Sequence, residues 1–186
     1  MEAAASSRES LVEPGGAAPG RPFVIRSASA SDCAAIAELV RELAAYEKLE
    51  QFARATPADF RDHLFGAQPA AEALIAEVEG APVGFAVMFR TFSTFRGRPG
   101  MYLEDVFVRP AYRGRGIGKA LLAEVARRAR DRGCGRLEWS VLNWNTPAIG
   151  FYRSLGARPL DEWTVFRLEE ESFERLGSLA DGPDSP

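Results

Sequence analysis

The stretch Val108–Leu122, VRPAYRGRGIGKALL, decides the fold, because it joins a strand-like run to a helix-like run through three glycines. The alternating apolar residues of MYLEDVFV, Met101–Val108, lead into it and are typical of a strand. Apolar residues at helical spacing follow it as far as Gly133, where the helix is expected to stop. A tight turn needs one or two glycines, so three indicate that something packs closely against the backbone here.

Two common phosphate-binding loops do not fit this stretch. A Walker A loop needs a glycine five residues before Gly118, where Arg113 stands. It also needs a hydroxyl residue after Lys119, where Ala120 stands. A dinucleotide-binding G-x-G-x-x-G fingerprint would need glycine at position 119 or 121, and neither position holds one.

The pattern that remains is Arg-x-x-Gly-x-Gly, at Arg113, Gly116 and Gly118. Free backbone N–H groups and the positive end of the helix dipole attract phosphate at such a strand-to-helix junction. Arg113, Arg115 and Lys119 add positive charge. The stretch therefore predicts a phosphate-bearing small ligand, and the alternative is a flexible turn with solvated arginines.

The periodicity of the remaining chain predicts an α/β fold with a mixed sheet. Strands are expected at residues 23–26, 73–78, 82–89, 101–108, 136–142 and 163–168, and helices at residues 30–47, 57–65, 118–133, 146–155 and 169–176. Glu79–Gly80–Ala81 is a good hairpin turn, which makes its two strands antiparallel. The unit from Met101 to Leu142 is expected to be a right-handed parallel crossover.

Length and composition predict one domain, which we place at residues 22–176 of the 186. Residues 1–21 and 177–186 are rich in small residues and are expected to be disordered. The net charge of −3 and the lack of an 18-residue apolar run argue against nucleic-acid and membrane partners. A single histidine, His63, and two distant cysteines, Cys33 and Cys134, predict no metal site and a cytoplasmic protein with reduced thiols.

Three stretches resemble the GNAT superfamily of acetyl-CoA-dependent N-acetyltransferases, and within it the diamine (spermidine/spermine-type) and thialysine branch. They are FVIRSASASDCAAIAELVRELAAYEKLE, YLEDVFVRPAYRGRGIG and WNTPAIGFYRSLGA. The similarity extends from about Phe23 to Leu168. It implies a mixed, mostly antiparallel sheet with helices on both faces, acetyl-CoA as co-substrate, no metal, and a homodimer.

The resemblance also implies where coenzyme A binds. Its pyrophosphate is expected on the loop of the glycine motif, and its pantetheine arm beside the preceding strand, like an added strand. The implied contacts are Val106, Phe107, Val108, Arg113, Gly114, Arg115, Gly116, Ile117, Gly118, Lys119, Asn145, Thr146, Pro147 and Ala148. Val106–Val108 are equally plain core residues, and Asn145 is equally a helix N-cap.

Two proton transfers are expected in the reaction, because the amine must lose a proton and the departing CoA thiolate gains one. The resemblance points to Tyr152 as the donor to the thiolate; its alternative role is to pack beside Phe151. Glu104 and Asp105 are the candidate bases, and alternation along a strand would let only one of them face the cleft. We favour Glu104 as amine anchor and possible base.

The implied substrate contacts are Tyr46, Glu47, Glu104, Glu138, Trp139 and Ser140, although sheet packing is an equal role for Trp139. The loop STFRGRPGM lacks the acidic residue and the tryptophan that the polyamine enzymes carry in this region. Arg96 and Arg98 would repel a polycation if they face the cleft.

The function predicted from the sequence is therefore acetyl transfer from acetyl-CoA to a primary amine of a small molecule, such as a polyamine, a diamine or a thialysine- or lysine-like amino acid. The alternatives are an acetyltransferase for protein lysines or N-termini, and a non-catalytic acyl-CoA-binding module.

Overall fold

The computed structural model describes residues 10–11 and 22–180, and the chain divides after Ser140 into two compact units. The first unit holds the whole sheet, and the second holds two helices. The expected disordered ends lie mostly outside the described residues. In the described parts of these ends, Ser10–Leu11 form strand β1 and Ser178–Ala180 form a 3-10 turn. A single domain over residues 22–176 stays a prediction.

The sheet has six strands, and each one pairs with the next one along the chain. They are β1 (Ser10–Leu11), β2 (Phe23–Ser27), β3 (Glu72–Val78), β4 (Ala81–Ser93), β5 (Arg98–Val108) and β6 (Leu137–Glu138). All neighbours are antiparallel except β5 and β6, which are parallel. This confirms the mixed, mostly antiparallel sheet and the parallel pair expected around the glycine motif.

The turns between strands agree with the sequence in one hairpin and differ in the next. Glu79 and Gly80 have φ values of 53° and 76°, the left-handed pair that a two-residue hairpin turn requires. The expected loop at residues 93–100 is shorter than predicted, because pairing of β4 with β5 continues to Ser93 and Arg98. Glycine, proline and arginine in this stretch disfavour a strand by their propensities, but pairing with the neighbouring strand stabilises one there.

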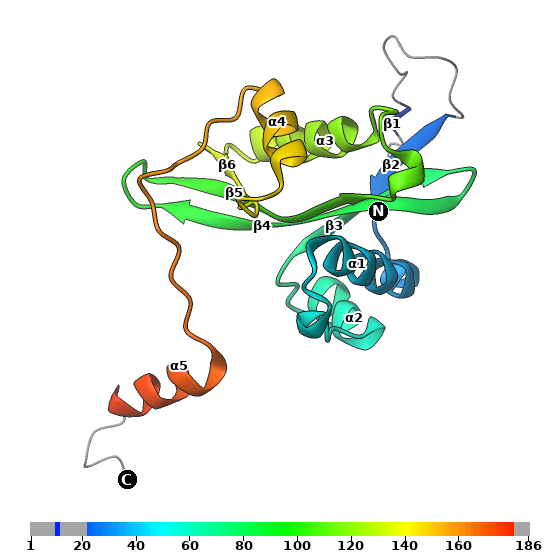
Figure 1. Ribbon diagram of the computed structural model, residues 1–186. Helices are drawn as coiled ribbons and strands as arrows, with labels where there is room; N and C mark the ends of the chain where they lie inside the picture. The colour runs from blue at the N-terminus through cyan, green and yellow to red at the C-terminus, as the bar shows by residue number, and fades with distance from the viewer. Residues whose placement is uncertain (1–9, 12–21, 181–186) are drawn as a thin grey trace, which may run out of the picture. The chain divides into compact units, whose positions relative to one another are not determined.

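Helices cover both faces of the sheet in the first unit (Figure 1), as expected. α1 (Cys33–Glu47) and α2 (Pro57–Phe65) lie on one face and α3 (Ile117–Asp131) on the other. Capping boxes precede these two helices: Ser29 N–H donates to Asp32 Oδ2 at 2.7 Å, and Thr56 Oγ1 accepts from Asp59 N–H at 3.3 Å. Between the sheet and α1 lies an apolar core of Ile36, Leu39, Leu43, Leu64, Ala73, Ile75, Phe85, Val87 and Phe107.

The second unit contains α4 (Thr146–Ser154) and α5 (Glu170–Gly177), both of which were expected. The expected strand at residues 163–168 is wrong, since no strand forms there, and β6 stops at Glu138 instead of Leu142. Val165 and Phe166 are 81% and 90% exposed, so they are not core residues of the described chain. Alternating apolar residues favour a strand, but a strand also needs a partner to accept and donate its backbone hydrogen bonds.

Candidate active site

The glycine loop, Arg113–Lys119, joins a 3-10 turn (Pro110–Tyr112) to α3. Gly114 and Gly116 have φ values of 74° and 84°, a left-handed conformation that other residues adopt at a cost. A Cβ at either position would meet nothing within 4 Å, so the backbone is open on the outside. The described residues supply no side-chain cap at Gly116, which leaves the first N–H groups of α3 for an anion.

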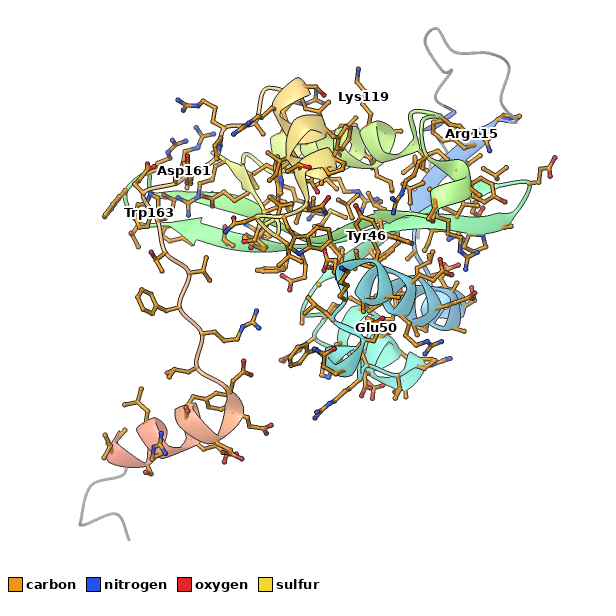
Figure 2. All side chains as sticks on the ribbon, viewed as in Figure 1. Tyr46, Glu50, Arg115, Lys119, Asp161 and Trp163 are labelled. Atoms are coloured by element: carbon orange, nitrogen blue, oxygen red, sulfur yellow. The ribbon has the colours of Figure 1, made fainter. Side chains whose placement is uncertain are left out.

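The cationic side chains of the glycine loop lie in different directions. Arg113 points toward α1: its Nε donates to the Val108 carbonyl oxygen at 2.9 Å, and its guanidinium carbon lies 4.6 Å from the Tyr46 ring centre. Arg115 stacks over Tyr112 at 5.5 Å. Lys119 is exposed and extends from α3 on the side away from the sheet (Figure 2). Both side chains are exposed, but Arg113 is held against Tyr46 and the Val108 carbonyl oxygen, whereas Lys119 extends into solvent.

The strand that precedes the loop has a free edge for most of its length. β6 pairs with β5 only at Met101 and Tyr102, and no strand continues this pairing among the described residues. The backbone of Val106 therefore lies on an open edge, as strand-like pairing with a pantetheine arm requires. Phe107 pairs with Phe85 and is buried in the core below α1, so its side chain has the core role that the sequence left open.

A β-bulge in β5 changes the direction of the two candidate bases. Asp105 pairs with Val87 while Leu103 pairs with Met88, so Glu104 is an extra residue in the ladder. A bulge breaks the alternation of side chains. Tyr102, Glu104 and Asp105 then share one face, so the alternation that would let only one carboxylate face the cleft does not apply at this bulge. This face is that of Val87, toward α1.

Asp105 has the most perturbed carboxyl group of this face. Burial, and to a lesser degree the negative charges of Glu104 and Glu47, raise the pKa of Asp105 to about 6. Glu47 is the last residue of α1, and burial also raises its pKa. Lys48 ends the helix in a left-handed conformation at φ 61°. Glu47, Glu104 and Asp105 are referred to as the acidic cluster; it sits at one end of α1 and attracts a cation.

β6 comes next to β5 in the sheet order, and Trp139 and Ser140 directly follow it in the chain. Glu138 pairs in register with Tyr102, and its carboxylate forms an ion pair with Arg136 at 2.7 Å. The Ser140 and Tyr102 hydroxyls are hydrogen-bonded at 2.8 Å. Trp139 is partly buried. The structure therefore brings Glu138 and Ser140 to Tyr102, a residue that strand periodicity could have identified two positions before Glu104.

The predicted residues of the second unit are found on α4. Asn145 is buried, and its Oδ1 accepts a hydrogen bond from Ala148 N–H at 3.3 Å, which confirms its N-cap role. Thr146 and Pro147 form the first turn. The Tyr152 ring is partly buried and lies 5.5 Å from the Phe151 ring. The placement of Asn145 and Tyr152 at the glycine loop stays a prediction.

Comparison with known proteins decides the family. A family model described as acetyltransferase (GNAT) family matches residues 36–157. The chain belongs to the GNAT family. It is 40% identical over 164 residues to a thialysine N-epsilon-acetyltransferase of Bos taurus, which covers 82% of this chain and 96% of that protein.

Solved structures agree with the GNAT fold. An integron cassette protein from the mobile metagenome of V. cholerae matches with a TM-score of 0.71 and 27% identity, over 85% of this chain and 99% of that one. An aminoglycoside N-acetyltransferase in complex with CoA matches with a TM-score of 0.65 and 23% identity, over 82% and 97% of the two chains. The family model and the 40% identical relative show a GNAT N-acetyltransferase, which confirms the enzyme class expected from the sequence.

Acetyl-CoA, the acetyl donor of GNAT enzymes, fits the residues present. The glycine loop is open, its amides lie at a helix N-terminus, and the edge of β5 beside it carries no strand among the described residues. The described residues contain no group of histidine, cysteine, aspartate and glutamate that could hold a metal ion. Among the same residues, every helix is too short or too polar to cross a bilayer.

Proposed function

We propose that this GNAT enzyme transfers the acetyl group of acetyl-CoA to a primary amine of a small molecule of the thialysine, lysine or diamine class. The observation that carries the proposal is the acidic cluster, whose three carboxylates lie on the α1 side of the strand that leads into the glycine loop. An ammonium group is attracted to such a cluster. The thialysine N-epsilon-acetyltransferase of Bos taurus supports this choice of substrate.

The acetyl donor would be held mainly by backbone. The amides from Gly114 to Lys119 and the dipole of α3 would bind the pyrophosphate, with Arg115 and Lys119 as its cations. The open edge of β5 at Val106 and Val108 would bind the pantetheine arm. When bound, acetyl-CoA supplies an activated thioester carbonyl for the amine to attack.

Within the acidic cluster, Asp105 is the residue that we assign to accept the proton of the amine. A base works best when its pKa lies near the working pH, and the pKa of Asp105 is raised to about 6. Glu104 is exposed, and we assign to it the role of amine anchor. Asp105 thus joins the expected site, and Glu104 keeps the anchoring role that the sequence suggested.

Tyr152 is the proposed proton donor to the CoA thiolate. A phenol of pKa ~10 donates to a thiolate whose conjugate acid has a pKa of ~8.5, which costs about 2 kcal/mol. Tyr152→Phe keeps the ring that packs beside Phe151 and removes only the hydroxyl. We expect the kcat of this variant to fall about tenfold or more while its affinity for CoA is unchanged, and full activity would exclude the role.

The positions of the arginines in the β4–β5 turn do not argue against a polycation as substrate. Arg96 Nη1 donates to the Gly135 carbonyl oxygen at 2.8 Å, and Arg98 Nη2 donates to that of Gly133 at 3.2 Å. Both carbonyls follow the C-terminal end of α3, so these side chains are held away from the acidic cluster. The repulsion that would arise if these arginines faced the cleft is not expected in this arrangement, so diamines and polyamines stay in the proposed substrate class.

A homodimer in the cytoplasm is also proposed. The exposed apolar side chains of Val165 and Phe166 support an association, because exposed apolar residues close together mark interaction surfaces. Light scattering on the purified chain would give a dimer mass, and the double variant Val165→Ser/Phe166→Ser would shift the chain to monomer. A monomer mass for the unchanged chain would contradict the dimer.

The test of the proposed function is free-thiol release from acetyl-CoA across a panel of amines. The panel holds thialysine, lysine, putrescine, spermidine, an aminoglycoside and a short lysine peptide. Turnover of thialysine, lysine or a diamine is the expected result. Preference for the peptide would indicate a protein acetyltransferase, and CoA binding without turnover of any amine would indicate an acyl-CoA-binding module.

A further inference from the structure

Helix α1 presents three side chains at four-residue intervals toward the segment that leads into the glycine loop. Glu38, Glu42 and Tyr46 share one face, because residues four apart in an α-helix are neighbours. Two arginines that are also four apart, Arg109 and Arg113, reach this face. These five residues are called the α1 clasp.

The first contact of the α1 clasp is made by Arg109, which directly follows β5. Its Nε lies 3.0 Å from each Glu42 carboxylate oxygen, and its Nη2 lies 2.8 Å from Glu38 Oε1. Its Nη1 donates to the Pro82 carbonyl oxygen at 3.0 Å. The hydrogen bond to Glu42 is the main cause that raises the pKa of Arg109. A guanidinium held by several acceptors is fixed in direction as well as in charge.

The second contact is made by Arg113, the first residue of the glycine loop. Its guanidinium carbon lies 4.6 Å from the Tyr46 ring centre and 5.5 Å from that of Phe107. Its Nε donates to the Val108 carbonyl oxygen at 2.9 Å. These are the distances of cation–π contacts. The segment between β5 and the loop is thus attached to α1 at both of its ends.

We propose that the α1 clasp positions the glycine loop and thereby helps to set the affinity for CoA. The loop contains three glycines, which lose more conformational freedom than other residues when a ligand orders them. A loop whose start is already fixed loses less freedom on binding, so the ligand binds more tightly. Glu38, Glu42 and Arg109 are positioning residues here; they act through the loop and do not touch CoA.

The test is calorimetric titration of CoA into single variants of the full chain. Arg109→Met and Glu42→Gln are expected to raise the Kd for CoA about fivefold, and Tyr46→Leu about threefold. Arg109→Met combined with Glu42→Gln is expected to equal the larger single effect, since both variants break the same contact. Arg109→Lys, which keeps the charge but not the planar fork, is expected to restore part of the affinity.

A matched control separates positioning from loss of stability. Arg26 also binds two carboxylates, Asp32 and Glu77, beside the other end of α1. Arg26→Met is expected to lower the melting temperature at least as much as Arg109→Met while leaving the Kd for CoA unchanged. Equal Kd values for Arg109→Met, Glu42→Gln and the unchanged chain would overturn the proposal, and so would an equal loss of affinity in Arg26→Met.

The inference rests on the proposed function, and the titration distinguishes the two. If the unchanged chain binds CoA and acetylates amines but Arg109→Met binds CoA equally well, the α1 clasp alone is refuted. If the unchanged chain does not bind CoA, the proposed function fails together with the α1 clasp.

Discussion

The two proposed substrate-binding regions of this enzyme, the glycine loop for CoA and the acidic cluster for the amine, are built from different parts of the chain. The glycine loop presents backbone amides at the start of α3, with two glycines in left-handed conformations. The acidic cluster presents side-chain carboxylates, and Asp105 has the raised pKa because of its burial and its charged neighbours. The first region should therefore depend on backbone geometry and little on pH, and the second on charge and strongly on pH.

The largest effect is expected from a substitution in the acidic cluster. Asp105→Asn removes the proposed base, so kcat/KM for the amine is expected to fall about 100-fold. In the unchanged chain the rate should fall as the pH drops through about 6, because Asp105 is then protonated. A pH–rate profile checks both points. An unchanged rate in Asp105→Asn would exclude Asp105 as the base, and Glu104 would then be the candidate base.

The same variant is expected to be more stable than the unchanged chain above pH 6. The pKa of Asp105 is about 6 in the folded chain and ~3.9 in the unfolded chain, so folding favours the protonated form. This contribution to stability is complete below about pH 4 and is lost as the pH rises through about 6, a change of about 3 kcal/mol. Asp105→Asn avoids the loss, so its melting temperature should exceed that of the unchanged chain at pH 8 but not at pH 4.

The next largest effect is expected from a substitution in the glycine loop. Gly116→Ala places a Cβ at φ 84°, which costs about 1–2 kcal/mol and displaces the amides at the start of α3. We expect the Kd for CoA to rise at least tenfold, with little change in its pH dependence. Gly133→Ala is the control, because Gly133 has φ 67° at the far end of the same helix. Equal loss of affinity in both variants would contradict the account.

A smaller effect is expected from Glu47, a second residue of the acidic cluster. Glu47→Gln removes one of the two charges that raise the pKa of Asp105. The acidic limb of the rate profile should move to lower pH, and the KM for the amine should rise about threefold because one anionic contact is lost. Glu124→Gln is the control, since that carboxylate of α3 is paired with Arg127 and Arg128 and has no proposed role in the site. A limb that stays in place would show that Glu47 does not act on Asp105.

The smallest effect concerns the residue that ends α1 and so holds the acidic cluster. Lys48 has φ 61°, a conformation that costs a lysine about 1–2 kcal/mol and a glycine almost nothing. Lys48→Gly should raise the free energy of unfolding by less than about 1 kcal/mol, because glycine is also more flexible in the unfolded chain. Urea denaturation measures this, and a loss of stability would show that the lysine side chain contributes there.

The sequence alone predicts the glycine loop better than the acidic cluster. The spacing of Gly116 and Gly118 is a local pattern, and it correctly placed the start of α3. Asp105 depends on a bulge and on Glu47, which is far away in the chain, and no local pattern reports either. The N-cap role of Asn145 was equally local and is confirmed.

Strand lengths failed for a related physical reason. Residues 163–168 have the alternation of a strand but no strand forms, whereas Arg98 lies among glycine and proline and still pairs with Ser93. Pairing depends on the partner strand as much as on the segment itself. Arg109 had no signal in the sequence at all, because its contacts with Glu38 and Glu42 arise only when β5 and α1 are packed together.

A competition assay tests the central claim most directly. Equal concentrations of thialysine, putrescine and a lysine peptide are incubated with a limiting amount of acetyl-CoA, and the acetylated products are quantified by mass spectrometry. The account predicts that most of the acetyl group is found on thialysine or putrescine, and that Asp105→Asn slows the transfer about 100-fold. Acetylation mainly of the peptide, or none in spite of CoA binding, would contradict it.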